Sequence, residues 1–257
     1  MPVDFCARIR EETKDIHKQA ASSRIIQLYM SDKITLKQHA EYLYQSRWVY
    51  IPIENRLRFS GYLGELFPLL ERGNALEHDA DYACKLLSFE PSIVNPWPET
   101  RQIIAAFDSA QSMESTLAFA YVHYLGLLNG GQMLQKKVSS LLENYVENDL
   151  TDLDSEYDSG VEFYSFENPA RLANRFRNYI NGAYENGRIT DNFIDEVKKV
   201  YQLVIAQANH GKPELSACEK YTAAASGFWK RHPYLTGAVT GLAATATVAT
   251  LAMTLSR

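Results

Sequence analysis

The stretch YVHYLGLLNGGQMLQKK, residues 121–137, decides how the rest of the chain is interpreted. Its apolar residues recur at helical spacing, yet Gly126, Gly130 and Gly131 fall inside the pattern. Each glycine inside a helix costs up to about 1 kcal/mol relative to alanine, so this cluster needs a reason. Gly126 and Gly130 are one turn apart and leave one helix face without Cβ atoms.

Three explanations of these glycines remain open at this point. Close packing of a second helix would account for one glycine. The pair at this spacing, with Gly131 beside it, favours either a flat ligand that lies against the backbone or a bend in the helix.

The sequence on both sides of this stretch predicts further helices, with no convincing alternating strand and no repeat. Pro52 lies inside one pattern and is expected to kink that helix or to start a new segment. The sequence therefore predicts an all-α fold of about eight helices in one domain, residues 1–212, followed by a linker, residues 213–232. The main helical candidates are residues 3–20, 35–58, 76–87, 98–107, 113–143, 169–186 and 190–210.

The composition excludes several classes of protein. Hydrophobic residues make up 46% and charged residues 22% of the 257 residues, as in globular proteins. The net charge of −5 argues against a protein that binds nucleic acid, because such a protein needs a basic surface. Cys6, Cys84 and Cys218 are far apart and form no CxxC pair, so neither a disulfide scaffold nor a thiolate zinc site is expected.

The C-terminal segment, residues 233–255, contains no charged residue. As a helix with a rise of about 1.5 Å per residue, it would span the roughly 30 Å core of a bilayer. We expect a transmembrane tail anchor with the body in the cytosol, at the endoplasmic reticulum rather than the outer mitochondrial membrane. Gly237 and Gly241 form a GxxxG motif that could pair two anchors into a homodimer. The alternative is a disordered tail rich in alanine and threonine.

His17 lies near the apolar face of the first predicted helix, one residue after Ile16. Such a histidine is commonly an ordinary core or surface residue. As a metal ligand it offers one imidazole nitrogen, which is too little for a zinc site but sufficient for haem iron, because the porphyrin supplies four more nitrogens. The other histidines show no metal-binding spacing.

Four motifs, in order along the chain, resemble those of the haem oxygenase family. EETKDIHKQA (residues 11–20) is similar to the first-helix motif with the proximal ligand, and YLGLLNGGQ (124–132) is similar to the kinked distal-helix motif. LFPLLERGNALEHDADY (66–82) and GVEFYSFENPARLANRFRNYI (160–180) resemble two further segments. The resemblance covers roughly residues 5–210, and the C-terminal segment matches the membrane anchor of animal members.

The resemblance implies a single helical domain that holds haem b, as both substrate and cofactor, between a proximal and a distal helix. The family opens haem to biliverdin and releases carbon monoxide and ferrous iron. It uses dioxygen and electrons from NADPH–cytochrome P450 reductase.

The resemblance also assigns roles to individual residues. By position, His17 would be the axial ligand of the iron, and Gly126 and Gly130, with Gly131 behind them, would let the distal helix lie against the porphyrin. Tyr50 matches a tyrosine of the distal pocket. The residues that match the propionate-binding edge are Tyr121, Arg10, Arg175 and Arg177.

Four positions depart from the family pattern. Leu127 stands where the family has its distal aspartate, His123 where it has an arginine and Val204 where it has an asparagine. Asn181 replaces a second arginine at the propionate edge. Leucine and valine can neither donate nor accept a hydrogen bond, so the usual water network beside the iron loses partners.

Two functions therefore stand side by side. The first is a haem oxygenase with an altered distal pocket, and the second is a non-enzymatic haem sensor or carrier that has lost ring opening. A third class, the di-iron oxidases and thiamin-degrading enzymes of similar fold, needs a carboxylate–histidine cluster or a catalytic cysteine, and the sequence shows neither at matching positions.

Overall fold

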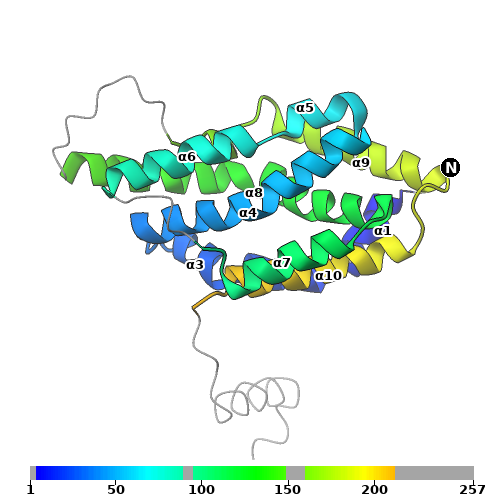
Figure 1. Cartoon of the computed structure of the whole chain (residues 1–257), viewed down its shortest axis with the longest axis horizontal. Helices are drawn as coiled ribbons and strands as arrows, with labels where there is room; N and C mark the ends of the chain where they lie inside the picture. The colour runs from blue at the N-terminus through cyan, green and yellow to red at the C-terminus, as the bar shows by residue number, and fades with distance from the viewer. Residues whose placement is uncertain (1–3, 89–94, 149–159, 212–257) are drawn as a thin grey trace, which may run out of the picture. The chain divides into compact units, whose positions relative to one another are not determined.

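The computed structural model describes residues 4–88, 95–148 and 160–211. These residues confirm the all-α prediction and form ten α-helices and two 3-10 helices, more than the eight helices expected (Figure 1). The α-helices are α1 (Phe5–Glu12), α2 (Lys14–Ala21), α3 (Arg24–Met30), α4 (Leu36–Ser60), α5 (Phe67–Leu70), α6 (Gly73–Leu86), α7 (Pro98–Ser109), α8 (Met113–Asn148), α9 (Pro169–Glu185) and α10 (Asn192–Ala208). The 3-10 helices are η1 (Gly64–Leu66) and η3 (Glu162–Tyr164).

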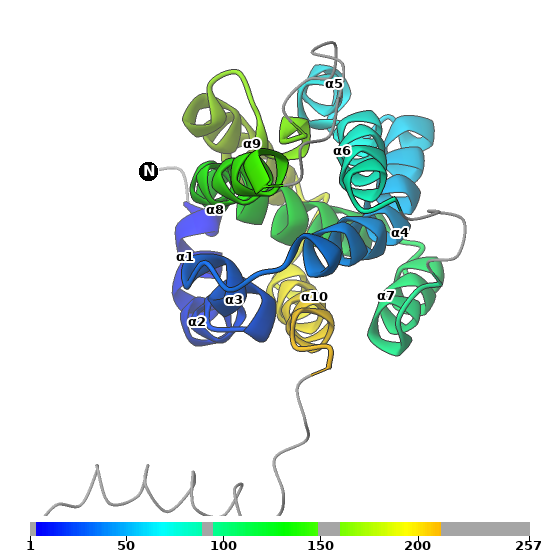
Figure 2. The ribbon, with the colours of Figure 1, turned by 90° about the vertical axis from the view of Figure 1, so that its left-hand side faces the viewer.

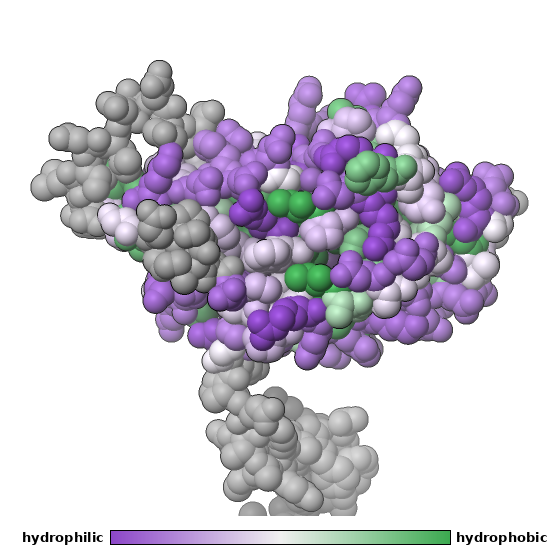
Figure 3. Space-filling view, viewed as in Figure 1, coloured by the Kyte–Doolittle hydropathy of each residue, from purple (hydrophilic) through white to green (hydrophobic). Residues whose placement is uncertain are grey.

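Helix α4 packs against both α6 and α8, and α10 packs against α8, α7 and α2 (Figures 1 and 2). Their facing sides form one hydrophobic core that runs through every α-helix except α2, which buries no residue. Hydrophilic side chains cover most of the surface seen in Figure 3. None of the described helices is long and apolar enough to cross a membrane, and the predicted anchor, residues 233–255, lies outside the described residues.

The first predicted helix is divided in two. Helix α1 ends before Thr13 and α2 begins after it. Thr13 is buried, and its hydroxyl donates a hydrogen bond to the carbonyl oxygen of Ile9 at 2.8 Å. A threonine hydroxyl that bonds one turn back competes with regular helix geometry, which gives a local reason for the break.

Of the two alternatives expected for Pro52, a kink in the helix or the start of a new segment, α4 contradicts the second. It runs through Pro52 without interruption over 25 residues. Its start is fixed by a capping box, in which Gln38 N–H donates to Thr35 Oγ1 at 3.2 Å and Thr35 N–H donates to Gln38 Oε1 at 3.0 Å. Packing against α6, α7 and α8 supports the helix along its length and offsets the cost of the proline.

A buried carboxylate joins α4, α6 and α8. Glu54 accepts hydrogen bonds from Arg72 N–H at 2.6 Å, Gly73 N–H at 2.9 Å and the Tyr124 hydroxyl at 3.1 Å. Burial raises the pKa of Glu54, whereas these three donors lower it. A Cβ atom at Gly73 would lie 2.6 Å from Glu54 Oε2, so only glycine fits beside this carboxylate.

Gly73→Ala is therefore expected to destabilise the fold by about 1–3 kcal/mol, because Glu54 must leave its donors to make room. Denaturant unfolding measures this change. Gly182→Ala in α9 is the control, since a Cβ there would meet nothing within 4 Å. That substitution should stabilise the protein by about 0.5–1 kcal/mol through helix propensity. Equal stability of the two variants would contradict the role given to Glu54.

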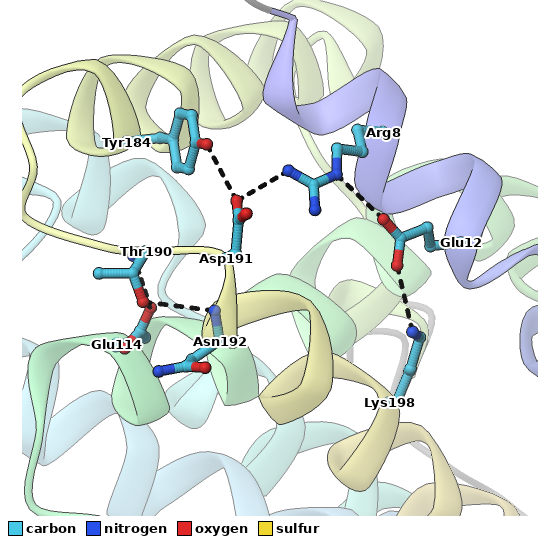
Figure 4. Close-up of polar contacts among 8 residues, drawn as sticks. All are labelled: Arg8, Glu12, Glu114, Tyr184, Thr190, Asp191, Asn192 and Lys198. Carbon is cyan, nitrogen blue, oxygen red and sulfur yellow. Dashed lines mark hydrogen bonds and ion pairs between the residues drawn. The ribbon is translucent and has the colours of Figure 1, made fainter.

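Surface ion pairs connect α1 with the turn before α10 and with α10 itself (Figure 4). Arg8 bonds Glu12 at 3.0 Å and Asp191 at 2.8 Å, and Lys198 lies 3.3 Å from Glu12. The Arg8 guanidinium holds the pKa of Asp191 below its usual value. Thr190 donates its backbone N–H and its hydroxyl to Glu114 of α8, and its hydroxyl oxygen accepts a hydrogen bond from the Asn192 N–H at the start of α10.

Candidate functional site

The glycine face of α8 is open. Cβ atoms built at Gly126 and Gly130 would meet nothing within 4 Å, whereas one at Gly131 would lie 3.3 Å from Leu127 Cδ1 and 3.6 Å from the Tyr164 carbonyl oxygen. Helix α8 is continuous through all three glycines. Gly131 therefore serves close packing, while the other two leave room for a flat ligand against the backbone.

His17 lies exposed on α2, and no described residue donates a hydrogen bond to its ring or accepts one from it. The ring stands edge-on to Tyr201 of α10, with centroids 6.1 Å apart. Helix α10 packs against both α2 and α8 (Figure 2). An imidazole in this position keeps a nitrogen available for a ligand.

Tyr121 marks one end of the site. It is almost fully buried on α8, with its ring 5.9 Å from the Phe193 ring. Burial raises the pKa of its phenol, and nearby Arg177 and Arg10 lower it. The two arginines, from α9 and α1, therefore lie close enough to Tyr121 of α8 to influence its phenol.

Arg177 is held directly against α8. Its guanidinium donates to Asn129 Oδ1 at 3.1 Å and to Asn174 Oδ1 at 3.0 Å. Asn129 precedes Gly130, so this cation lies at the edge of the open glycine face. Arg175 is exposed two residues earlier on α9, about 200° around the helix from Arg177. Arg175 therefore lies on a different face of α9 from Arg177.

The predicted distal residues Tyr50 and His123 contact each other. The Tyr50 hydroxyl donates to the His123 carbonyl oxygen at 3.2 Å, and the two rings meet edge to face. His123 Nδ1 lies 2.8 Å from the Phe119 carbonyl oxygen and must donate to it, which leaves Nε2 as an acceptor. Burial lowers the pKa of His123 to about 4, so this residue does not replace the positive charge of an arginine.

The remaining substituted positions serve packing or structural ties. Leu127 is 7% exposed and packs over Gly131, and Val204 is half-buried against the core. Asn181 accepts a hydrogen bond from Cys6 N–H at 2.8 Å and donates to Asp4 Oδ1 at 3.2 Å, so it ties α9 to the start of α1.

Sequence reasoning missed Tyr201, which stands against His17. Burial raises its pKa to about 12, and it is close enough to influence the pKa of Tyr121. No sequence signal identifies it, because its importance comes from the packing of α10 against both α2 and α8.

The donor set fits haem better than a metal ion held by side chains. Across the described ranges, no group of three or more histidine, cysteine or carboxylate side chains could hold a metal, and Cys6 and Cys84 are buried free thiols. An accessible imidazole, a helix face without Cβ atoms and cations at its edge are what a flat anionic macrocycle requires.

Comparisons with known proteins agree with this fit. The family model described as "Heme oxygenase" matches residues 3–209. Heme oxygenase 1 of Gallus gallus is 24% identical, with 80% of this chain and 69% of that protein covered, and heme oxygenase 1 of Homo sapiens is 22% identical over 80% and 70%.

Solved structures show the same fold. The heme oxygenase from Leptospira interrogans has a TM-score of 0.66 at 24% identity and covers 80% of this chain and 99% of its own. Heme oxygenase-1 from Synechocystis, solved in complex with heme, has a TM-score of 0.65 at 18% identity, with 88% and 98% covered. The chain belongs to the haem oxygenase family.

Proposed function

We propose that the chain binds haem b as substrate and cofactor between α2 and α8 and opens it to biliverdin, carbon monoxide and ferrous iron. The observation that carries this proposal is the open face at Gly126 and Gly130. This face belongs to α8. Helix α10 packs against both α8 and α2, and α2 carries His17.

Each residue of the site has a definite task in this proposal. His17 binds the iron through one imidazole nitrogen, while Arg10 and Arg177 neutralise the propionates. Bound haem supplies the iron that activates dioxygen and the ring that is oxidised. Arg177 reaches its position because Asn129 accepts its hydrogen bond, so this amide orients a cation beside the glycine face.

Proton supply distinguishes this chain from the family pattern. Leu127 offers no polar atom, His123 Nε2 is an acceptor at neutral pH, and the Asn129 amide already donates to the Leu125 carbonyl oxygen at 2.7 Å. The Tyr50 hydroxyl donates to a backbone carbonyl. Ring opening therefore depends on protons delivered by water.

The test uses the full-length chain in detergent, loaded with hemin and given NADPH and cytochrome P450 reductase, the proposed electron donor. Formation of biliverdin and ferrous iron, followed spectrally, supports the enzyme. A haem complex that is reduced but stays intact would support the second candidate, a haem sensor or carrier. The leucine at position 127 favours that candidate, because its side chain cannot form a hydrogen bond that would order water near the iron.

Valine at Gly126 or Gly130 is expected to weaken haem binding at least about tenfold, or 1.4 kcal/mol, because a branched side chain would fill the open face. Haem titration measures the affinity, and circular dichroism checks the helix content. Gly182→Val is the matched control, since this helical glycine of α9 also has open space at its Cβ. If all three variants bind haem alike, the glycine face does not hold the macrocycle.

Residues 233–255 are proposed to anchor the chain in the endoplasmic reticulum membrane with the body in the cytosol. Full-length protein should sediment with membranes and resist carbonate extraction, because the segment has no charge and is long enough to span a bilayer. A chain ending at residue 232 should stay in the supernatant with the same haem spectrum. Full-length protein in the supernatant would refute the anchor.

A homodimer through the anchor is a separate proposal that rests on Gly237 and Gly241. Crosslinking in membranes should detect it. Gly237→Ile should remove the crosslinked species without releasing the chain from the membrane.

A further inference from the structure

Helix α2, which carries His17, has few contacts of its own with the core. It contains eight residues and buries none of them. Among the described helices, it packs most closely against α10. The position of the His17 side chain therefore depends on the side chains that α10 presents to α2.

The imidazole ring of His17 lacks the support that a metal-binding histidine usually has. Such a histidine commonly donates its second ring N–H to a carboxylate or a backbone carbonyl, and this bond fixes the rotation of the ring. Within residues 4–88, 95–148 and 160–211, no group forms a hydrogen bond with the His17 ring. Its ring contact is with Tyr201 of α10, at 6.1 Å between centroids and an interplanar angle of 86°. An edge-to-face contact of this kind favours one orientation of the imidazole over others.

A second contact ties the start of α2 to the same face of α10. Lys198 precedes Tyr201 by three residues, so both side chains lie on one face of that helix. Lys198 Nζ lies 3.3 Å from Glu12 Oε2, and Glu12 is the last residue of α1 before the break that leads into α2 (Figure 4). Glu12 also pairs with Arg8, and Arg8 pairs with Asp191. Exposed ion pairs are weak individually, but linked pairs hold their geometry better than isolated ones.

We propose that this face of α10 positions the iron ligand. The Tyr201 ring fixes the rotation of the His17 imidazole, and the Lys198–Glu12 pair fixes the start of α2. The proposal rests on the proposed function, because it requires His17 to bind haem iron. An imidazole that is already oriented loses less rotational freedom when it binds, so both positioning residues strengthen the haem complex.

Nuclear magnetic resonance of the full-length chain in detergent, without haem, tests the ring contact. A nuclear Overhauser effect should connect ring protons of His17 and Tyr201, because the edges of the two rings come closer than their centroids. It should disappear in Tyr201→Leu. If wild type shows no such effect, the proposal is overturned whether or not the chain opens haem.

Tyr201→Leu also tests the effect on the iron ligand. The probe is the cyanide complex of the hemin-loaded chain, in which the proton shifts of the haem methyl groups depend on the plane of the axial imidazole. The variant should change the spread of these shifts. It should also weaken haem binding about twofold to tenfold, as expected for the loss of one aromatic pair.

Two further variants make this result specific to the ring. Tyr201→Phe keeps the aromatic contact and should match wild type in methyl shifts and affinity. Gln202→Leu introduces the same leucine at the next, exposed position of α10 and should also match wild type. The proposal fails if Tyr201→Leu leaves the methyl shifts unchanged, or if Tyr201→Phe alters them as much as Tyr201→Leu does.

Lys198→Met tests the contact at the start of α2. It removes the cation beside Glu12 and should raise the rate of haem loss about twofold, in keeping with an exposed ion pair. Lys199→Met is the matched control, because Lys199 pairs at 2.6 Å with Glu196 of the same helix. It removes the same charge without releasing α2, so the rate should stay that of wild type. Equal rates in the two variants would remove Lys198 from the proposal.

His17→Ala separates failure of this proposal from failure of the proposed function. If the spectrum of the hemin complex does not depend on His17, the proposed iron ligand and the positioning role both fail. If the spectrum depends on His17 but the methyl shifts do not depend on Tyr201, the positioning role alone fails.

Discussion

Replacing His17 with alanine is expected to abolish the histidine-ligated spectrum of the hemin complex. Wild-type protein should show a six-coordinate, histidine-type Soret band, with four nitrogens from the porphyrin, one from His17 and water as the sixth ligand. His17 is exposed on a helix that buries no residue, so its removal leaves the fold intact. Added imidazole should occupy the vacated position and restore the band.

His210→Ala provides the control for this experiment. His210 is half-exposed near the end of α10, where its ring stacks on Trp97 and Nδ1 lies 2.9 Å from Glu99. It should leave the Soret band unchanged. The assignment of His17 is wrong if the His17→Ala spectrum equals that of wild type, or if both variants lose the band equally.

The helical fold could be predicted because apolar residues keep a helical period over most of the body. Where the observed helices differ from the predicted ones, the causes are local and the spacing of apolar residues does not show them. Thr13 divides one predicted helix through a side-chain hydrogen bond to its own backbone, and Pro52 is tolerated because neighbouring helices support α4 on several sides. The short helices α3 and α5 were not anticipated, since seven and four residues give too few turns for a period to show.

Part of the site could be predicted from the sequence. Those residues are of a type that is unusual for the helix in which they lie. Gly126 and Gly130 are costly in a helix, and the structure shows open space at both. Arg177 lies beside Asn129 as a cation of the site should, but Arg175 has the same charge and faces another direction. The sequence alone indicates that these two arginines point in different directions, because residues two positions apart are about 200° apart around a helix.

Other features of the site depend on tertiary packing. Tyr201 becomes important only because α10 packs against both α2 and α8. Similarly, Tyr29 and His39 come from different helices, and the contact of 2.8 Å between the hydroxyl and Nδ1 is visible only once the core is assembled. Asn181 matches a propionate-binding position, yet the structure uses it to bond Cys6 and Asp4.

Leu127→Asp is expected to destabilise the fold and to improve its chemistry. Leu127 is 7% exposed and packs over Gly131, near the Tyr164 carbonyl oxygen, which would repel a carboxylate. Burying an unpaired carboxylate there should cost about 3 kcal/mol, measured by denaturant unfolding at neutral pH. Leu127→Asn is the matched control, because it has the same shape without the charge and should cost less.

The same substitution should raise the yield of biliverdin per NADPH, since the introduced carboxylate would accept hydrogen bonds from water on the distal side. The gain should be partial, because His123 and Val204 still lack the polar atoms of the family pattern. Wild type should open haem slowly and give mixed biliverdin isomers, since Asn181 is committed to Cys6 and Asp4 and leaves one propionate without its arginine. Product chromatography separates the isomers. Rapid formation of one isomer by wild type, with no improvement in Leu127→Asp, would show that a carboxylate is not needed at this position and that Tyr50 or bound water suffices.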